Sequence, residues 1–345
     1  MNKKKLGMIY AIVIVIILGL VLYFSLKDNF KEIIKLITNI NFIWIILSVL
    51  LLFIYRFLGG TSIYLLVKNS KENISIWKTF QLNFITLFFN GVTPFATGGQ
   101  PMTVYYLHKE NISVEKSTNI VLQNFIMYQT ALILVGLITI LYNHLRPIFP
   151  FNSFMRRLVV LGFLINFGVW LVTFLLAFGK KSVTGILEKI IKLLYRIGII
   201  RNLDKYLKKL NDISSKFYGS AINLLNNKNV IFKSILANVL SLLFLYSIPF
   251  VLASGLGINS LTIWDSIVAT SYVMIMGSFV PLPGGTGGIE YGFMYFFKYL
   301  INGSVLSALM LVWRFITYYV GIITGALFLI FYRKKSKVWL KKEIS

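Results

Sequence analysis

Residues 263–300 read IWDSIVATSYVMIMGSFVPLPGGTGGIEYGFMYFFKYL, an apolar stretch broken at its centre by prolines and glycines. A second stretch of this kind, residues 79–107, reads TFQLNFITLFFNGVTPFATGGQPMTVYYL. Non-helical backbone inside a membrane is tolerated only where protein buries it or a water-filled cavity receives it. The arm after the first break is also too short and too polar to span a bilayer, which takes about 20 helical residues. We therefore expect two re-entrant hairpins, over residues 80–107 and 263–300.

The composition places these hairpins in a polytopic membrane protein. Of the 345 residues, 57% are hydrophobic and 13% are charged, whereas soluble domains are nearer half apolar and a quarter charged. Six stretches are long and apolar enough to cross the bilayer, and the first lacks the small-residue cleavage site of a signal peptide. They lie near residues 7–26, 42–66, 118–142, 157–178, 231–252 and 305–332.

The composition also argues against several classes of function. Cysteine is absent and histidine occurs twice, so thiolate or histidine metal centres and cysteine- or histidine-based catalysis are not expected. No spacing of acids, histidines or serines resembles a hydrolase, and we expect neither enzyme activity nor a metal or cofactor. The formal net charge of +24 could indicate a nucleic-acid partner. In so apolar a chain the positive-inside bias explains the charge, and no nucleic-acid binding is expected.

The distribution of basic residues predicts the topology. If each broken stretch crosses the membrane an even number of times, the eleven lysines and arginines from Lys180 to Lys228 share a side with the N-terminal lysines and the basic C-terminal segment. Counting the first broken stretch as one crossing would place that loop outside. Because basic loops stay in the cytoplasm, we predict that both termini are cytoplasmic.

The order of elements repeats within a single transmembrane domain of residues 1–345. Span, span, hairpin and span over residues 1–142 are followed by the same order over residues 143–345, starting from the opposite side of the membrane. The predicted fold is an all-α integral membrane protein with an inverted 4+4 repeat of six spans and two broken re-entrant hairpins. The connection between the halves, residues 179–229, is basic and amphipathic and is expected to lie on the cytoplasmic leaflet.

The candidate binding site combines the two breaks with two arginines inside spans. Paired Gly/Pro-interrupted helices in inverted halves indicate a transporter site at the membrane midplane, and the helix N-termini after the breaks are expected to offer unpaired N–H groups to an anion. An arginine within a span costs about 2.5 to 3.5 kcal/mol, so we predict that Arg314 pairs with Glu290 and that Arg56 is free to bind phosphate. Alternatively, Glu290 only caps its own helix and the arginines only pin helices together. The predicted substrate-binding residues are Arg56, Pro94, Gly98, Gly99, Gln100, Pro281, Gly284, Gly285, Gly287, Gly288, Glu290 and Arg314.

These segments resemble the transmembrane family of lysylphosphatidylglycerol synthases, which is the flippase portion of the bacterial multiple peptide resistance factor. The resemblance is carried by NGVTPFATGGQP at 90–101, VPLPGGTGGIE at 280–290, Arg56, and WRFITYY around Arg314. It implies a protein of the bacterial inner membrane that moves a phospholipid, anionic or aminoacylated like lysylphosphatidylglycerol, between leaflets. In the family, this lowers the negative surface charge and gives resistance to cationic antimicrobial peptides. By position, Glu290 and Arg314 match the acid and base of the family's second-half motif.

The family's soluble synthase domain has no counterpart before the last residue, Ser345, so a stand-alone translocase without lysyltransferase activity is expected. Two other functions stay open. The chain could be a secondary transporter of a small soluble anion, with a cavity sealed from lipid. It could also be the membrane component of a phosphatidylglycerol lysyltransferase system, with a separate synthase subunit as its partner. A second copy of the chain, in a homodimer, is a further partner to consider.

Overall fold

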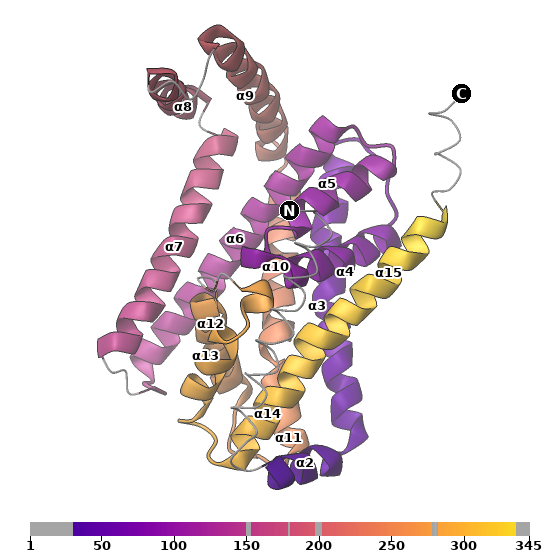
Figure 1. The fold of residues 1–345 in the computed structure, drawn as a ribbon, viewed down its shortest axis with the longest axis vertical. Helices are drawn as coiled ribbons and strands as arrows, with labels where there is room; N and C mark the ends of the chain where they lie inside the picture. Colours follow the sequence, from indigo (N-terminus) through magenta and orange to yellow (C-terminus); the bar gives the residue numbers. More distant parts are fainter. Residues whose placement is uncertain are drawn as a thin grey trace, which may run out of the picture.

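The computed structural model describes residues 30–149, 153–178, 180–196, 202–277, 280 and 282–335, which form helices joined by short turns (Figure 1). No strand occurs in these ranges, and the predicted all-α class is confirmed. Five helical stretches are long and apolar enough to cross a membrane: Phe42–Asn69, Val114–Leu145, Arg157–Leu175, Lys228–Gly255 and Ser304–Tyr332. They correspond to five of the six predicted spans, and the sixth, residues 7–26, lies outside the described residues.

The helices α2 to α15 follow one another along the chain. They are α2 (Phe30–Asn39), α3 (Phe42–Asn69), α4 (Ile76–Val92), α5 (Gly99–Lys109), α6 (Val114–Leu145), α7 (Ser153–Phe178), α8 (Lys180–Arg196), α9 (Leu203–Leu225), α10 (Lys228–Tyr246), α11 (Ile248–Gly255), α12 (Ile263–Gly277), α13 (Gly288–Phe297), α14 (Ser304–Arg314) and α15 (Gly321–Lys335). One span combines α10 with α11, which has Pro249 in its first turn. Another combines α14 with α15 through a π-helical segment, Phe315–Val320.

Helix α2 was not predicted, because the sequence analysis assigned its residues to a connection between spans. Ile37 and Ile40 pack against the hydrophobic core, and the helix contacts α14. Asn41 follows α2 and caps the N-terminus of α3, because its side-chain oxygen accepts a hydrogen bond from the Ile43 N–H at 3.0 Å.

Both predicted hairpins are helix–break–helix units. Helices α4 and α5 flank the 3-10 turn Pro94–Ala96, and α12 and α13 flank the 3-10 turn Pro283–Gly285. Helix α5 begins at Gly99, and Pro101 is its third residue. Helix α13 is capped by Gly287 and carries Glu290 in its first turn. The re-entrant path of these units through a membrane stays a prediction.

The two 3-10 turns share an unusual backbone. Phe95 and Ala96 follow the first proline with φ angles of 53° and 52°, and Gly284 and Gly285 follow the second with φ angles of 64°. These values lie in the left-handed region, which glycine adopts freely and other residues rarely enter. The two halves therefore turn the chain in the same way, with glycines in one half and Phe-Ala in the other.

Two apolar clusters surround the two broken units. One includes Tyr55, Ala131 and buried apolar residues of α12 and α13. The other includes Ile63 and Met127 with Leu82 and Ile85 of α4 and Tyr106 and Leu107 of α5. Helices α3 and α6 pass through both clusters. Figure 1 shows α4 and α5 toward one end of the molecule and α12 and α13 toward the other. The 3-10 turns contact each other between them.

Helix pairs from the two halves pack in matching combinations. Helix α4 packs against α15, α12 packs against α6, and α3 packs against α10. Close approach of α4 and α15 depends on small residues, as the sequence indicates: a Cβ atom at Gly321 would lie 2.5 Å from Leu87 Cδ2, and one at Gly325 would collide with the carbonyl oxygen of Phe84. If each helix is replaced by its predicted counterpart in the other half, the pair α4–α15 becomes α12–α6, and the pair α3–α10 stays the same. The inverted repeat itself stays a prediction.

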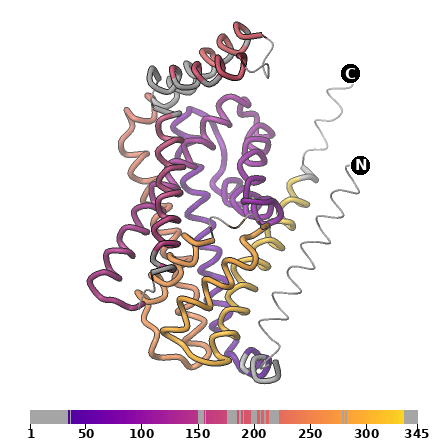
Figure 2. The backbone as a smooth tube through the Cα atoms, turned by 60° about the vertical axis from the view of Figure 1, so that its left-hand side comes forward, coloured from indigo at the N-terminus to yellow at the C-terminus, as the bar shows by residue number. Residues whose placement is uncertain are grey.

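Helices α8 and α9 pack together across one end of the bundle (Figure 2). Leu193 on α8 is 57% exposed, and Tyr206 on α9 is 46% exposed. Exposed apolar side chains on basic amphipathic helices are typical of helices that lie at a membrane surface. Their place on the cytoplasmic leaflet stays a prediction.

Candidate functional site

A buried ion pair joins α13 to the end of α14. Arg314 donates from Nε to Glu290 Oε1 at 2.6 Å, and the two residues are 8% and 6% exposed. The second carboxylate oxygen of Glu290, Oε2, accepts the Gly287 N–H at 2.7 Å. The predicted pair is therefore present, and Glu290 caps its own helix as well. Their role as substrate ligands stays a prediction.

Arg314 and Tyr318 connect the last span to both breaks. Arg314 donates from Nη2 to the Gly284 carbonyl oxygen at 2.8 Å, within the second 3-10 turn. The Tyr318 hydroxyl donates to the Gly91 carbonyl oxygen at 2.9 Å, in the last turn of α4. The guanidinium carbon of Arg314 also lies 4.6 Å from the centre of the Tyr318 ring, a cation–π contact. One segment of the last span thus holds both broken helices.

This segment includes a change of helical geometry. The α-helix ends at Arg314, and residues Phe315–Val320 are π-helical before α15 begins. π-Helical turns within α-helices are rare and occur frequently at functional sites, because the extra residue re-aims the side chains around it. Here the π-helical segment carries Tyr318 and contacts α3.

The N–H groups at the start of α5 are bound by neighbouring side chains. The Gly98 N–H donates to Thr93 Oγ1 at 2.9 Å, and the Gly99 N–H donates to Asn90 Oδ1 at 2.8 Å. A Cβ atom at Gly99 would collide with Asn90, so glycine allows this close approach. The prediction of unpaired N–H groups for an anion is therefore wrong at Gly98, Gly99 and Gly287, because internal oxygens already accept from them.

Arg56 lies near the middle of α3 and has only neutral partners. Its Nη1 donates to Asn83 Oδ1 at 3.2 Å, and its guanidinium carbon lies 4.2 Å from the centre of the Tyr55 ring. The Nε atom is buried and donates to no atom of the described residues. Along α3, Arg56 falls between Tyr55 of one apolar cluster and Ile63 of the other. Within the described ranges, no ion pair joins Arg56 to a carboxylate, and its role as a phosphate ligand stays a prediction.

The other predicted residues fall at the breaks. Pro94 and Gln100 are exposed, while Gly284, Gly285 and Gly288 are partly buried in or beside the second turn. Pro281 lies outside the described residues. In the parts of the chain that the structure describes, no group of three histidine or acidic residues is placed to hold a metal ion.

Sequence reasoning missed the residues that hold the breaks in place. Tyr318 was not singled out, although it follows Arg314 by about one helical turn within WRFITYY. Asn83 and Asn90, which contact Arg56 and the Gly99 N–H, were not singled out either. The sequence feature that could have indicated them is an amide side chain within an apolar helix, because a buried polar side chain needs a hydrogen-bond partner.

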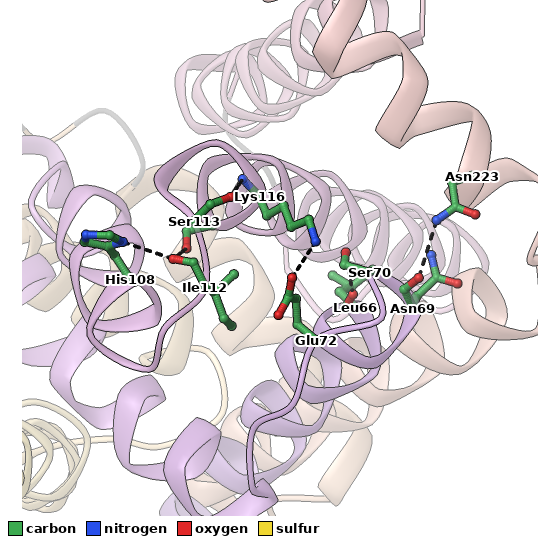
Figure 3. Close-up of polar contacts among 10 residues, drawn as sticks. Leu66, Asn69, Ser70, Glu72, His108, Ile112, Ser113, Lys116 and Asn223 are labelled. Atoms are coloured by element: carbon green, nitrogen blue, oxygen red, sulfur yellow. Dashed lines mark hydrogen bonds and ion pairs between the residues drawn. The ribbon is translucent and has the colours of Figure 1, made fainter.

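A second polar cluster lies at the end of α3 that is next to α9 (Figure 3). Lys116 pairs with Glu72 at 2.5 Å, and Asn223 of α9 donates to the Asn69 carbonyl oxygen at 3.4 Å. His108 Nδ1 lies 3.1 Å from the Ile112 carbonyl oxygen. The imidazole ring therefore contacts the backbone of the turn that follows α5. The cluster joins the base of the first broken unit to α3 and to α9.

Comparison with known proteins relates the chain to one family. The sequence matches the family model described as the lysylphosphatidylglycerol synthase TM region over residues 8–325. A relative from Archaeoglobus fulgidus, named UPF0104 membrane protein, is 25% identical over 341 residues. The match covers 90% of this chain and 93% of that relative.

Proposed function

The chain belongs to the lysylphosphatidylglycerol synthase transmembrane family, and from this premise we propose that it is a lipid translocase of the cell membrane, moving a phospholipid between leaflets. The observation that carries the proposal is the meeting of two broken helices beside the buried Glu290–Arg314 pair. Broken helices that meet within a membrane protein provide polar backbone and charged groups at a depth where lipid offers none.

The proposed path takes the head group past the contact between the two 3-10 turns, while the acyl chains stay in lipid. The cargo proposed is phosphatidylglycerol or its lysyl or alanyl ester, as the family suggests. The ammonium group of an aminoacylated lipid can replace the Arg314 guanidinium at Glu290, because both are cationic hydrogen-bond donors. Arg314 also holds the Gly284 carbonyl oxygen. Its displacement would therefore loosen the second turn and couple head-group binding to opening of the site.

The test is reconstitution of the purified chain in liposomes with fluorescent phosphatidylglycerol, its lysyl ester or a neutral lipid. The readout is the fraction of each lipid that an external quencher reaches over time. We expect protein-dependent movement that discriminates between head groups and slows at least about tenfold in Glu290→Gln, because this change removes the charge that pairs with Arg314.

A matched control makes the same chemical change at a surface ion pair. Glu72 pairs with Lys116 at 2.5 Å outside the candidate site, and Glu72→Gln should leave lipid movement unchanged. Folded protein that moves no lipid would overturn the proposal. Uptake of inorganic phosphate by the same liposomes, without lipid movement, would instead favour the soluble-anion transporter.

A further inference from the structure

The charged groups of the candidate site do not balance. Glu290 and Arg314 neutralise each other at 2.6 Å, whereas Arg56 is hydrogen-bonded to the amide of Asn83 and lies against the ring of Tyr55. Arg56 is partly buried, and its Nε atom is fully buried. A guanidinium remains charged at any physiological pH, and burying part of a charge without an opposite charge is costly. Arg56 therefore carries a positive charge that no carboxylate of the described residues compensates.

The free edge of this guanidinium suits an oxyanion. Asn83 accepts from Nη1, while Nε has no hydrogen-bond partner in the described part of the chain. The Nε and Nη2 groups of arginine form a planar edge whose two parallel N–H bonds match two oxygens of a phosphate. Tyr128 of α6 also lies near enough to interact electrostatically with the guanidinium, and a tyrosine hydroxyl can donate a further hydrogen bond to phosphate.

The surrounding helices place Asn83 at this guanidinium. A Cβ atom at Gly59 would lie 2.9 Å from Asn83 Nδ2, so glycine at this position lets the amide pack directly against α3. At Gly60, a Cβ atom would lie 2.9 Å from the backbone of Phe80. Two successive glycines thus bring α4 close to α3 beside Arg56.

We infer that Arg56, positioned by Asn83, binds a phosphate group, either in the head group of a membrane phospholipid or as soluble phosphate. The inference rests on the proposed function and names the chemical group that it recognises. Arg56 would take the phosphate, and the Glu290–Arg314 pair would respond to the remainder of the head group. Because the N–H groups of Gly98, Gly99 and Gly287 have internal partners, they do not compete with Arg56 for this role.

The test measures binding in detergent, separately from transport. Purified full-length protein is titrated with fluorescent phosphatidylglycerol and with diacylglycerol of the same acyl chains, and the binding of inorganic phosphate is measured separately by calorimetry. We expect phosphatidylglycerol to bind and diacylglycerol not to bind. Arg56→Gln should weaken phosphatidylglycerol binding roughly 10- to 100-fold, since it removes charge-assisted hydrogen bonds. Arg56→Lys should fall between, because it keeps the charge and loses the paired donors.

Asn83→Asp separates binding from folding. The new carboxylate would lie beside Nη1, where Oδ1 now accepts at 3.2 Å, and would neutralise Arg56 internally. We expect phosphatidylglycerol affinity to fall about as far as in Arg56→Gln, while the melting temperature of the lipid-free protein stays equal or rises. A purely structural role for Arg56 predicts unchanged affinity. The matched control is Asn73→Asp, because Asn73 accepts from Lys68 at 2.7 Å away from this site, and its affinity should not change.

The outcomes distinguish this inference from the proposed function. Unchanged phosphatidylglycerol affinity in both Arg56→Gln and Asn83→Asp would overturn the phosphate site, whether or not the liposomes show lipid movement. Arg56-dependent binding without lipid movement would support the site and contradict the translocase. Arg56-dependent binding of inorganic phosphate, with no binding of phosphatidylglycerol, would support the site and identify soluble phosphate as its ligand.

Discussion

The Tyr318 hydroxyl donates to the Gly91 carbonyl oxygen at 2.9 Å, and this bond joins the last span to the end of α4. The last carbonyl groups of a helix have no partner within the helix, so Tyr318 satisfies a group that the break at Pro94 leaves open. The same ring lies against Gly284 of the second turn. Tyr318 therefore contacts both broken units.

Tyr318→Phe should separate the hydroxyl from the ring. The change keeps the contact with Gly284 and leaves the Gly91 carbonyl oxygen without its donor, which should cost about 1 to 3 kcal/mol of stability. Thermal unfolding in detergent measures this cost, and the liposome assay should show altered lipid movement. The neighbouring variant Tyr319→Phe is the control, because the Tyr319 hydroxyl makes no hydrogen bond within the described residues. Equal effects of the two variants would contradict a specific role for the Tyr318 bond.

Gly284→Ala should disrupt the contact between the second turn and the last span. Gly284 has a φ angle of 64°, and a Cβ atom there would collide with the Tyr318 ring. The variant therefore combines left-handed strain, about 1 to 2 kcal/mol, with a steric clash that displaces Tyr318 or the turn.

The matched variant for this change is Gly257→Ala. Gly257 has a φ angle of 80° and open space around its Cβ position, so the substitution adds strain without a clash. We expect Gly284→Ala to lower the melting temperature more than Gly257→Ala and to reduce lipid movement, while Gly257→Ala keeps it. The opposite order of stabilities would argue against the packing of Tyr318 on Gly284.

The helix breaks and the ion pair were predictable because each depends on information within a short stretch or on a scarce residue type. Proline and glycine end an apolar helix wherever it folds, and this places the breaks at Pro94 and Pro283. A buried carboxylate must find a cation. Because Glu290 was the carboxylate placed well inside the membrane part, its pairing with one of two arginines followed, and the choice of Arg314 is confirmed.

The groups that surround the breaks were not predictable in the same way. Tyr318 is one aromatic residue among many in the spans, and no local pattern separates an inward tyrosine from a lipid-facing one. The acceptors for the Gly98 and Gly99 N–H groups are side chains of Thr93 and Asn90, whose reach depends on the exact path of the turn. The amides predicted to bind an anion are therefore satisfied by the protein itself, and the charge without a carboxylate partner in the described residues lies at Arg56 instead.

Ala96→Gly tests the likeness between the two turns. Ala96 has a φ angle of 52° at the position that corresponds to Gly285. Because glycine enters the left-handed region at little cost, the substitution should relieve about 1 kcal/mol of strain and raise the melting temperature. Strain at such positions is often tied to function, and we expect the relaxed turn to slow lipid movement. A lower melting temperature would show that the Ala96 side chain stabilises the turn.

Single-cysteine labelling tests the predicted topology, and the absence of native cysteine makes it direct. Lys208→Cys lies on α9, and Asn302→Cys lies in the turn between α13 and α14; both positions are exposed. If the basic connection is cytoplasmic, a membrane-impermeant maleimide applied to intact cells should label the protein with Asn302→Cys and spare the protein with Lys208→Cys. After the cells are opened, both should react. Labelling at Lys208→Cys in intact cells would reverse the orientation of the α8–α9 end and would remove the basis for an inverted second half beginning outside.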